Sequence, residues 1–235
     1  MKREEIVRLA CFADTRIRRI EPVSSHGHTH RLFRIDTDKG AFALRCGRES
    51  MPTMREARIQ CAAASLKLAP DIVWQDARCQ VMPWIEGTHL LSLDTPHLDA
   101  LVDALRRLHR DVPCEGKPYD MAALVVSRDA EIVNALETLS RLPHTIAMCH
   151  HDLNPHNIIW QGTCSWFIDF EYAAPNDVCF DLASVCVEFG LNETQQRHML
   201  RRYFGDMSSY EKLCAYKVLY AQLCREWFSR REAGV

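Results

Sequence analysis

The part of this sequence best suited to chemistry is a cluster of acids, amides and histidines. It lies among three short apolar segments, 146–149, 158–160 and 165–170, which we expect to be strands. The segment 146–149 is followed directly by groups that can hold protons or metal ions: His150, His151, Asp152, Asn154, His156 and Asn157. A later apolar segment, 165–170, contains Asp169, and Glu171 follows two residues after it. Carboxylate and amide oxygens at the ends of adjacent short strands can point to one spot. Hard divalent cations such as Mg²⁺ prefer such all-oxygen ligands, so we expect a magnesium site here.

Two motifs in this cluster have the order and spacing of a phosphoryl-transfer site. His150-x-Asp152-Leu153-x-x-x-Asn157 and the following Ile-Asp169-Phe resemble the H-R-D-L-x-x-x-N and D-F-G motifs of kinases. The resemblance implies that Asp152 is the catalytic base, while Asn157 and Asp169 hold metal ions bridging the nucleotide phosphates. Because aspartate is a weak base, Asp152 would mainly orient the acceptor hydroxyl and take its proton late. The alternative is a polar turn that caps a strand, but two motifs joined by a short hairpin favour the site.

The composition is that of an ordinary globular protein. The chain has 235 residues, 47% of them hydrophobic and 26% charged, enough for one large domain or two small lobes. Its 29 basic and 31 acidic residues give a net charge of −2, so nothing indicates nucleic-acid binding. Charged residues interrupt every apolar run, and the start Met-Lys-Arg-Glu-Glu lacks the apolar core of a secretion signal. We therefore expect a cytoplasmic protein that does not enter a membrane.

The eleven cysteines do not form a recognisable disulfide or zinc framework. Their number is odd, and no two of them form a C-x-x-C pair. Several lie in apolar stretches, where a thiol behaves as a small hydrophobic group: Cys61, Cys149, Cys164, Cys186 and Cys214. We predict that the cysteines are reduced and buried. No cysteine lies at ligand spacing from the histidines near position 150, which argues against zinc.

The first third of the chain is predicted to contain a small sheet and one main helix. A short helix is expected over 2–12, followed by strands joined by turns over 16–45. The main helix is expected over 51–66, where small residues recur and prolines lie near both ends. A further pair of strands over 72–82 leads into an irregular stretch at 83–87. We interpret this stretch as a hinge.

Several residues of this part are candidates for nucleotide binding. The third expected strand reads Phe-Ala-Leu-Arg45 and resembles the V-A-I-K strand of kinases, with arginine in place of lysine. Arg45 could bind phosphates bidentately, although a solvated arginine at a strand end is common. Glu56 is its candidate partner, although a glutamate in a first helical turn also favours the helix dipole. Gly27, the one glycine of a polar loop, could cover the phosphates, and we expect adenine near the backbone of Met82 and Trp84.

The remainder of the chain is predicted to be mostly helical. Leucines and a valine recur at core spacing over 98–110, and a second amphipathic helix is expected over 121–139. Three further helices are expected over 180–189, 193–203 and 210–231. There is no internal repeat and no low-complexity segment. This half therefore supplies helices around the polar cluster.

The whole pattern resembles the protein-kinase-like fold, which is α+β and bilobal. The resemblance implies a nucleotide-binding lobe over 1–85, with a small antiparallel sheet and one main helix, and a larger helical lobe over 86–235 for catalysis and acceptor binding. The stretch 150–157 is similar to that of the small-molecule kinases, namely aminoglycoside phosphotransferases, choline and ethanolamine kinases and thiamine kinase. Ile-Asp-Phe-Glu-Tyr over 168–172, followed by Phe-Asp-Leu-Ala over 180–183, is most similar to the bacterial choline and thiamine kinase branch.

The resemblance also implies a function and further residue roles. It implies ATP and Mg²⁺ as cofactors and transfer of the γ-phosphoryl group to a hydroxyl of a small molecule. Glu171 would assist the metal ion, and Arg45 would hold the nucleotide phosphates. His150 would pack the loop, and Asp181 would brace it by accepting its backbone N–H groups.

The acceptor is predicted from the aromatic residues and acids of the last helices. Tyr172, Tyr220 and Trp227 could bind a cation through their aromatic faces, although core packing is the commoner meaning of such residues. The modest number of acids over 184–235 favours a small amino alcohol or a thiamine-like acceptor over an aminoglycoside, and choline or ethanolamine is the first choice. Thiamine kinase and aminoglycoside phosphotransferase are the alternatives within this class. The single-glycine loop and the short carboxyl end also allow a kinase-fold binding protein without turnover.

Overall fold

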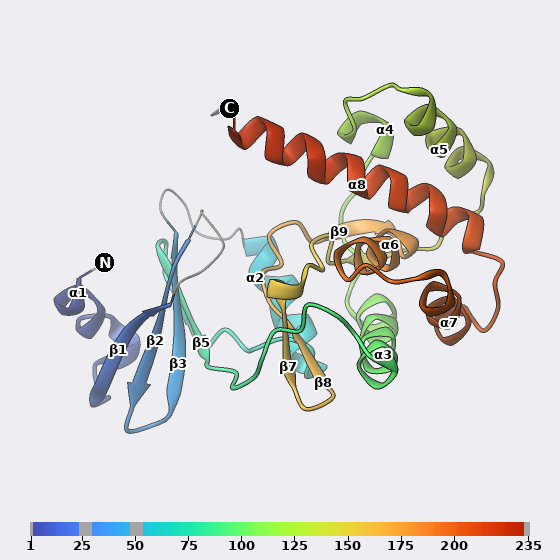
Figure 1. The fold of residues 1–235 in the computed structure, drawn as a ribbon. Coiled ribbons are helices and arrows are strands. Elements are labelled where there is room, and N and C mark those ends of the chain that lie inside the picture. Colours follow the sequence, from blue (N-terminus) through green and yellow to red (C-terminus); the bar gives the residue numbers. More distant parts are fainter. Residues whose placement is uncertain (1, 24–29, 48–53, 233–235) are drawn as a thin grey trace. The chain divides into compact units, whose positions relative to one another are not determined.

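The computed structural model describes residues 2–23, 30–47 and 54–232. The chain divides into two compact units, Met1–Gly87 and Thr88–Val235, called here the smaller and the larger unit. Figure 1 traces the elements of both along the sequence. The predicted first turn of the main helix, residues 51–53, lies outside the described residues.

The smaller unit is an antiparallel sheet with one long helix, α2, over Met54–Ser65. The strands lie in the order β1-β2-β3-β5-β4: β1 Ile17–Val23, β2 His30–Thr37, β3 Ala41–Gly47, β4 Trp74–Gln75 and β5 Cys79–Pro83. The expected helix over 2–12 is instead two pieces, α1 Arg3–Val7 and the 3-10 turn η1 Ala10–Phe12. An extended backbone at Leu9 separates them, and both Ile6 and Phe12 are thereby buried in the core.

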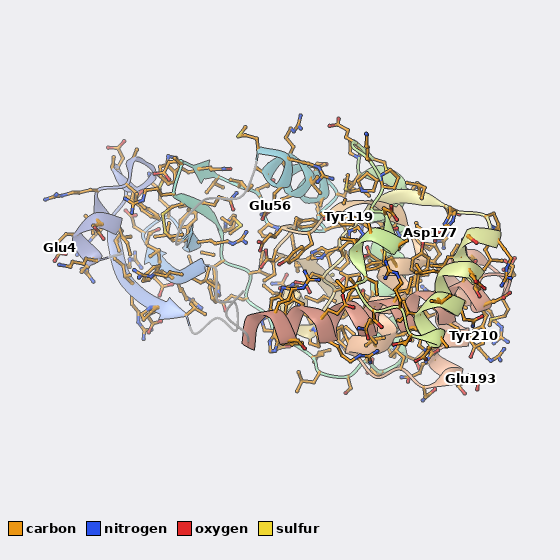
Figure 2. All side chains as sticks on the ribbon, turned by 90° about the horizontal axis from the view of Figure 1, so that it is seen from above. Glu4, Glu56, Tyr119, Asp177, Glu193 and Tyr210 are labelled. Atoms are coloured by element: carbon orange, nitrogen blue, oxygen red, sulfur yellow. A yellow bond between two sulfur atoms is a disulfide. The ribbon has the colours of Figure 1, made fainter. Side chains whose placement is uncertain are left out.

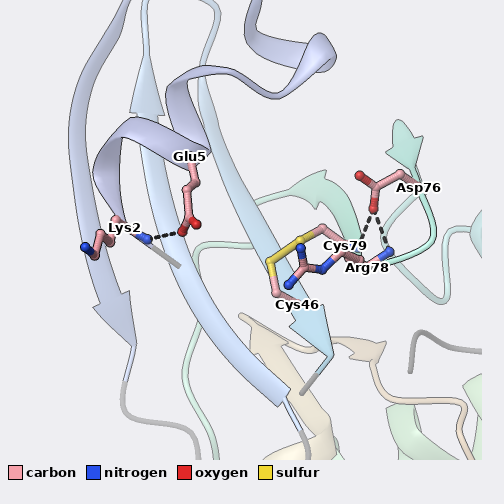
Figure 3. The surroundings of a disulfide bond; sticks show 6 residues. All are labelled: Lys2, Glu5, Cys46, Asp76, Arg78 and Cys79. Atoms are coloured by element: carbon pink, nitrogen blue, oxygen red, sulfur yellow. Dashed lines mark hydrogen bonds between the residues drawn. A yellow bond between two sulfur atoms is a disulfide. The ribbon is translucent and has the colours of Figure 1, made fainter. Parts of the chain in front are cut away.

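Two opposite cysteines of this sheet form a disulfide, contrary to the prediction that the cysteines are reduced. Cys46 of β3 and Cys79 of β5 are register partners, and Figure 3 shows the bond between them. Their separation of 33 residues conceals this pairing in the sequence. The prediction of burial is also wrong for Cys61 and Cys164, which are exposed, and Cys214 is only partly buried. Cys61 lies on the outer face of α2, because the buried alanines of that helix occupy the other face.

The larger unit contains six α-helices among its described residues: α3 Thr95–Asp111, α4 Met121–Leu124, α5 Ala130–Arg141, α6 Cys179–Glu188, α7 Glu193–Phe204 and α8 Tyr210–Glu232. The long α8 packs against α5 and α6, as Figure 1 shows. Figure 2 gives a second view, with Asp177 and Tyr119 labelled in this unit and Glu56 on α2. Among the described residues no helix has both the length and the apolar character needed to cross a membrane.

The expected helix over 121–139 is broken between α4 and α5. Glu226 of α8 accepts the backbone N–H groups of Val126 and Ser127 at 2.9 and 2.8 Å. The Arg128 guanidinium donates to nearby carbonyls, and Asp129 caps the start of α5. A side chain 100 residues away therefore interrupts a helix that the local pattern predicts to be continuous.

Two short antiparallel strand pairs hold the polar cluster. β6, Ile146–Cys149, pairs with β9, Ala174–Asp177, and β7, Ile158–Gln161, pairs with β8, Cys164–Phe167. The three expected strands are thus present, but the first pairs with a strand that the sequence pattern did not predict. A 3-10 turn, η2, over Pro155–Asn157 connects the loop to β7.

Candidate functional site

The loop that follows β6 is held from behind by one buried carboxylate. Asp181 of α6 accepts the backbone N–H groups of His150 at 2.7 Å and of His151 at 2.9 Å. His109 of α3 donates from Nε2 to the same carboxylate at 3.0 Å. Burial alone would raise the pKa of Asp181, but the hydrogen bond and charge of His109 lower it to about 2. The bracing contacts expected of Asp181 are therefore present.

His109 was missed by the sequence reasoning. Its second ring nitrogen, Nδ1, lies 2.7 Å from the hydroxyl of Tyr203 on α7. One possible ligand atom from each of His109, Cys149 and Asp181 lies within 4.8 Å of the others. His109 bonds Asp181, Asp181 bonds the loop, and the Cys149 thiol donates to the backbone carbonyl of Asn176, so these contacts give the three residues a structural role. The available signal was a histidine in the apolar stripe of an amphipathic helix, directly after Leu108.

His150 fixes the beginning of the loop. Its Nε2–H donates to the Ile168 carbonyl at 3.1 Å, and its Nδ1 accepts the Asp152 N–H at 3.3 Å. These two bonds together require the Nε2–H tautomer, because a carbonyl can only accept and an N–H can only donate. The ring packs against Phe170, with centroids 4.7 Å apart. His150 therefore connects the loop to the segment that carries Asp169.

The carboxylate of Asp152 is bonded by two side-chain amides. Asn157 Nδ2 donates to Asp152 Oδ2 at 2.7 Å and to its backbone carbonyl at 2.9 Å. Asn154 Nδ2 donates to Asp152 Oδ1 at 2.8 Å. Because Asn157 directs its nitrogen toward Asp152, its carbonyl oxygen is the end that can bind a cation.

Asp169 is joined to this loop through its neighbour. The backbone N–H of Ile168, the residue before Asp169, donates to the backbone carbonyl of Asn157 at 3.0 Å. Asp169 itself has a left-handed backbone with φ of 66°. The structure thus brings Asp152, Asn157 and Asp169 into one region of the larger unit. Carboxylate and amide oxygens are ligands that Mg²⁺ prefers, and Asn157 and Asp169 could supply them.

Tyr172 lies beside the acids of this region. Burial is the main cause that raises the pKa of its phenol, and the charges of Glu171, Asp152 and Asp169 add to it. Trp227 of α8 makes a hydrogen bond to Tyr172, and an indole can only donate. Tyr172 is therefore close to the carboxylates, and Trp227 contacts Tyr172.

Tyr220 combines a core ring with a polar contact. Its ring is buried against Phe180, with centroids 5.7 Å apart, so core packing is part of its role. Its hydroxyl donates to Glu188 of α6 at 2.8 Å. Burial raises the pKa of Glu188, and the charge of Asp152 raises it further. Burial and the Glu188 charge raise the pKa of the nearby Cys224 thiol to about 11.

The smaller unit contains a buried ion pair. Arg45 Nη1 donates to Glu56 Oε1 at 2.9 Å, and both side chains are less than 10% exposed. The pairing expected between these residues is observed. The alternative of a solvated arginine at the strand end is wrong.

The structure says less about the other three candidates for nucleotide binding, Met82, Trp84 and Gly27. Met82 is buried, and its sulfur accepts from Gln60 Nε2 at 3.0 Å. The Trp84 N–H donates to the Ala41 carbonyl at 2.9 Å, so it is engaged within the sheet. Gly27 lies outside the described residues.

Comparison with known proteins decides the family. The sequence matches the family model described as "Phosphotransferase enzyme family" (APH) over residues 19–216. The chain belongs to this family. The resemblance stated from the motifs is therefore confirmed.

Solved structures with the same fold support the α+β kinase-like prediction. A choline/ethanolamine kinase family protein from Mesorhizobium loti is 22% identical, with a TM-score of 0.81 over 99% of this chain and 85% of its own. Choline kinase LicA from Streptococcus pneumoniae is 19% identical, with a TM-score of 0.79 over 98% and 91%. At such identities the likeness establishes the fold alone.

Curated relatives of this chain match over shorter segments. Protein LicA of Haemophilus influenzae is 36% identical over 64 residues, 27% of this chain and 24% of that protein. The chain thus spans about a quarter of the length of that relative.

A second residue that the sequence reasoning missed is Glu188. It follows Asp181 by seven residues on α6, two helical turns later, and so lies on a similar face. That spacing was the available signal. Its contact with Tyr220 depends on how α6 packs against α8, which the local pattern does not determine.

Proposed function

We propose that this protein is an ATP- and Mg²⁺-dependent kinase that phosphorylates the hydroxyl of a small cationic alcohol, choline or ethanolamine. The observation that carries the proposal is the hydrogen-bonded pair of Asp152 and Asn157, joined through Ile168 to Asp169. The names of two solved neighbours, a choline/ethanolamine kinase family protein and a choline kinase, support the acceptor class. Neighbours described in complex with AMP or AMP-PNP support nucleotide use.

Asp152 would orient the acceptor hydroxyl. Its carboxylate receives one amide N–H on each oxygen, which leaves lone pairs on both for a hydroxyl donor. A hydrogen bond from the acceptor to this carboxylate would direct the hydroxyl oxygen toward the phosphorus. Asp152 would take the proton late, since the loose transition state requires little base strength.

Residues for nucleotide binding are proposed within each unit by itself. Asn157 and Asp169, assisted by Glu171, would hold Mg²⁺, which when bound neutralises negative charge on the phosphates. Arg45 would bind the phosphates, with Glu56 fixing the direction of its guanidinium. We expect adenine at the backbone near Met82 and Trp84. Gly27 belongs to the loop proposed to cover the phosphates.

The cationic end of the acceptor would lie near Tyr172 and Trp227. A quaternary ammonium group donates no N–H hydrogen bond, so it is bound by aromatic faces and by carboxylate charge. Glu188 supplies such a charge next to Asp152, and Tyr220 orients it. This arrangement supports a small cation over a large polyhydroxylated acceptor.

An ADP-release screen tests the proposal. The acceptors are choline, ethanolamine, thiamine, homoserine, methylthioribose and several aminoglycosides, with Asp152→Ala as the paired variant. We expect choline or ethanolamine to give the highest kcat/KM. Asp152→Ala should lose roughly 10²- to 10⁴-fold in kcat, while ATP still raises its melting temperature. Undiminished activity in this variant would contradict the mechanism.

Two other outcomes would change the conclusion. A preference for thiamine or an aminoglycoside would retain phosphoryl transfer and replace the acceptor. If no acceptor released ADP above the water background while ATP still raised the melting temperature, the protein would be a nucleotide-binding protein without turnover.

A further inference from the structure

Both the oxygen and the nitrogen of the Asn154 side-chain amide make hydrogen bonds within the loop. Its Oδ1 accepts the backbone N–H of His156 at 2.9 Å and so caps η2. Its Nδ2 donates to Asp152 Oδ1 at 2.8 Å. The oxygen must face His156, because a backbone N–H can only donate, and the nitrogen must therefore face Asp152. The orientation of this amide is thus determined by its bonds.

Together the two amides hold the plane of the Asp152 carboxylate. Asn157 binds one oxygen at 2.7 Å, and Asn154 binds the other at 2.8 Å. With one donor alone, the carboxylate could rotate about its Cβ–Cγ bond, a broad and soft torsion. The second donor removes that freedom.

The two amides differ in what else they do. Asn157 is the expected metal ligand, and replacing it would alter nucleotide binding as well as Asp152. Asn154 is half-buried, and its bonds are to Asp152 and to the start of η2. Its contribution can therefore be separated from that of the metal ion.

We propose that Asn154 is a positioning residue that fixes the Asp152 carboxylate in the plane needed to receive the acceptor hydroxyl. The inference rests on the proposed kinase function. It assigns Asn154 no contact with the nucleotide or the acceptor. Misplacing a reacting group by a fraction of an ångström lowers the rate of the chemical step without weakening substrate binding.

The decisive variant is Asn154→Asp. Aspartate caps a helical turn as well as asparagine does, so the bond to His156 N–H is retained. The amide donor is replaced by a carboxylate oxygen, which can only accept and carries the same negative charge as Asp152. The bond to Asp152 is therefore lost. We expect kcat for the acceptor to fall about 10- to 100-fold, while KM for ATP and the ATP-induced rise in melting temperature stay within twofold of wild type. Asn154→Ser, which also caps but lacks the amide, should fall in the same direction.

The matched control is Asn192→Asp. Asn192 caps α7, with Oδ1 accepting the Gln195 N–H at 3.0 Å, and its bonds do not involve Asp152. This variant should retain the wild-type kcat. If Asn154 served only as a cap, Asn154→Asp would also retain kcat, and that result would overturn the inference.

A second measurement does not depend on turnover. In ¹H–¹⁵N spectra of the full chain, the side-chain amide signals of Asn154 should shift when Asp152 is replaced by alanine, while those of Asn192 stay in place. Unshifted Asn154 signals would mean that the contact is absent and would overturn the inference. A wild-type protein that phosphorylates no acceptor would overturn the proposed function and the inference with it. An active wild type with fully active Asn154→Asp would overturn the inference alone.

Discussion

The loop that follows β6 and helix α8 are held by different kinds of contact. In the loop, Asp152 is bonded by side chains two and five residues away. In α8, Tyr220 bonds Glu188 across 32 residues, and Glu226 bonds Val126 across 100. Contacts between residues close in the sequence can stay the same while contacts between distant residues change. Under the proposed function, the loop would carry out the reaction and α8 would determine what is bound beside it.

The two regions also differ in backbone strain. His151 and Asp169 have left-handed backbones with φ of 69° and 66°, which side chains other than glycine rarely adopt. Helix α8 is a regular helix of 23 residues. A strained backbone conformation persists where surrounding contacts hold it in place. Here the N–H of His151 donates to Asp181, and the N–H of Ile168, next to Asp169, donates to the backbone carbonyl of Asn157.

The largest expected effect comes from removing the support of the loop. Asp181→Ala deletes a fully buried carboxylate that holds two backbone N–H groups and His109. Losing one partner of a buried charged network costs about 3–5 kcal/mol, because the remaining groups are left buried and unpaired. Urea unfolding measures this loss. Asp120→Ala, which removes an exposed cap of α4, should cost about 1 kcal/mol. Equal losses in the two variants would contradict the role given to Asp181.

The same carboxylate should make stability depend on acid pH. Its folded pKa of about 2 lies below its ordinary value of 3.8, so its contribution is fully present above pH 3.8. It is lost as the pH falls through about 2, and its magnitude is roughly 2 kcal/mol. Urea unfolding of wild type and Asp181→Asn between pH 6 and 2.5 measures it. The difference in stability between the two proteins should shrink on acidification. A constant difference would show that Asp181 does not titrate as its bonds predict.

The variant Glu188→Gln tests the proposed role of α6 and α8 in acceptor binding. If α8 and α6 determine what is bound, this neutral isostere should raise KM for choline about tenfold. It should leave KM for ATP unchanged, since the lost contribution is attraction to the cation. Steady-state kinetics with each substrate varied separates the two constants. Glu193→Gln, an exposed acid at the start of α7, serves as the control. A rise in KM for ATP instead would place Glu188 with the nucleotide.

The sequence predicted what local patterns encode. The two motifs predicted that Asp152, Asn157 and Asp169 gather in one place, because a short hairpin joins them. The spacing of apolar residues predicted most helices of the larger unit. The Arg45–Glu56 pair was also predicted, since strand β3 and helix α2 are consecutive in the chain.

The failures share one physical cause, which is contact between distant segments. Glu226 breaks a helix that its own sequence predicts to be continuous. Cys46 and Cys79 pair because their strands are adjacent in the sheet, with α2 and β4 between them in the sequence. His109 and Glu188 meet their partners only after α3, α6 and α8 have packed. None of these contacts changes the local periodicity.

The smallest expected effect on stability is that of Lys67→Gly, which serves as the reference for relief of backbone strain. Lys67, with φ of 57°, is exposed and ends α2, where Leu68 N–H donates to Ala63 and Lys67 N–H to Ala64. This is the position at which glycine commonly ends a helix. Lys67→Gly should raise the free energy of unfolding by about 0.5–1 kcal/mol without changing activity.

The corresponding change in the loop should have the opposite sign. His151→Gly relieves a similar backbone conformation, but it also deletes a buried ring that packs between Tyr119 and Phe180. Its Nε2 also bonds Asn176 at 2.9 Å. Burial of the ring lowers the pKa of His151 to about 4, so the ring is neutral and packs as a largely apolar group near pH 7. Urea unfolding should therefore show stabilisation for Lys67→Gly and net destabilisation for His151→Gly. Stabilisation of both would mean that the left-handed loop residue is tolerated rather than required by its packing.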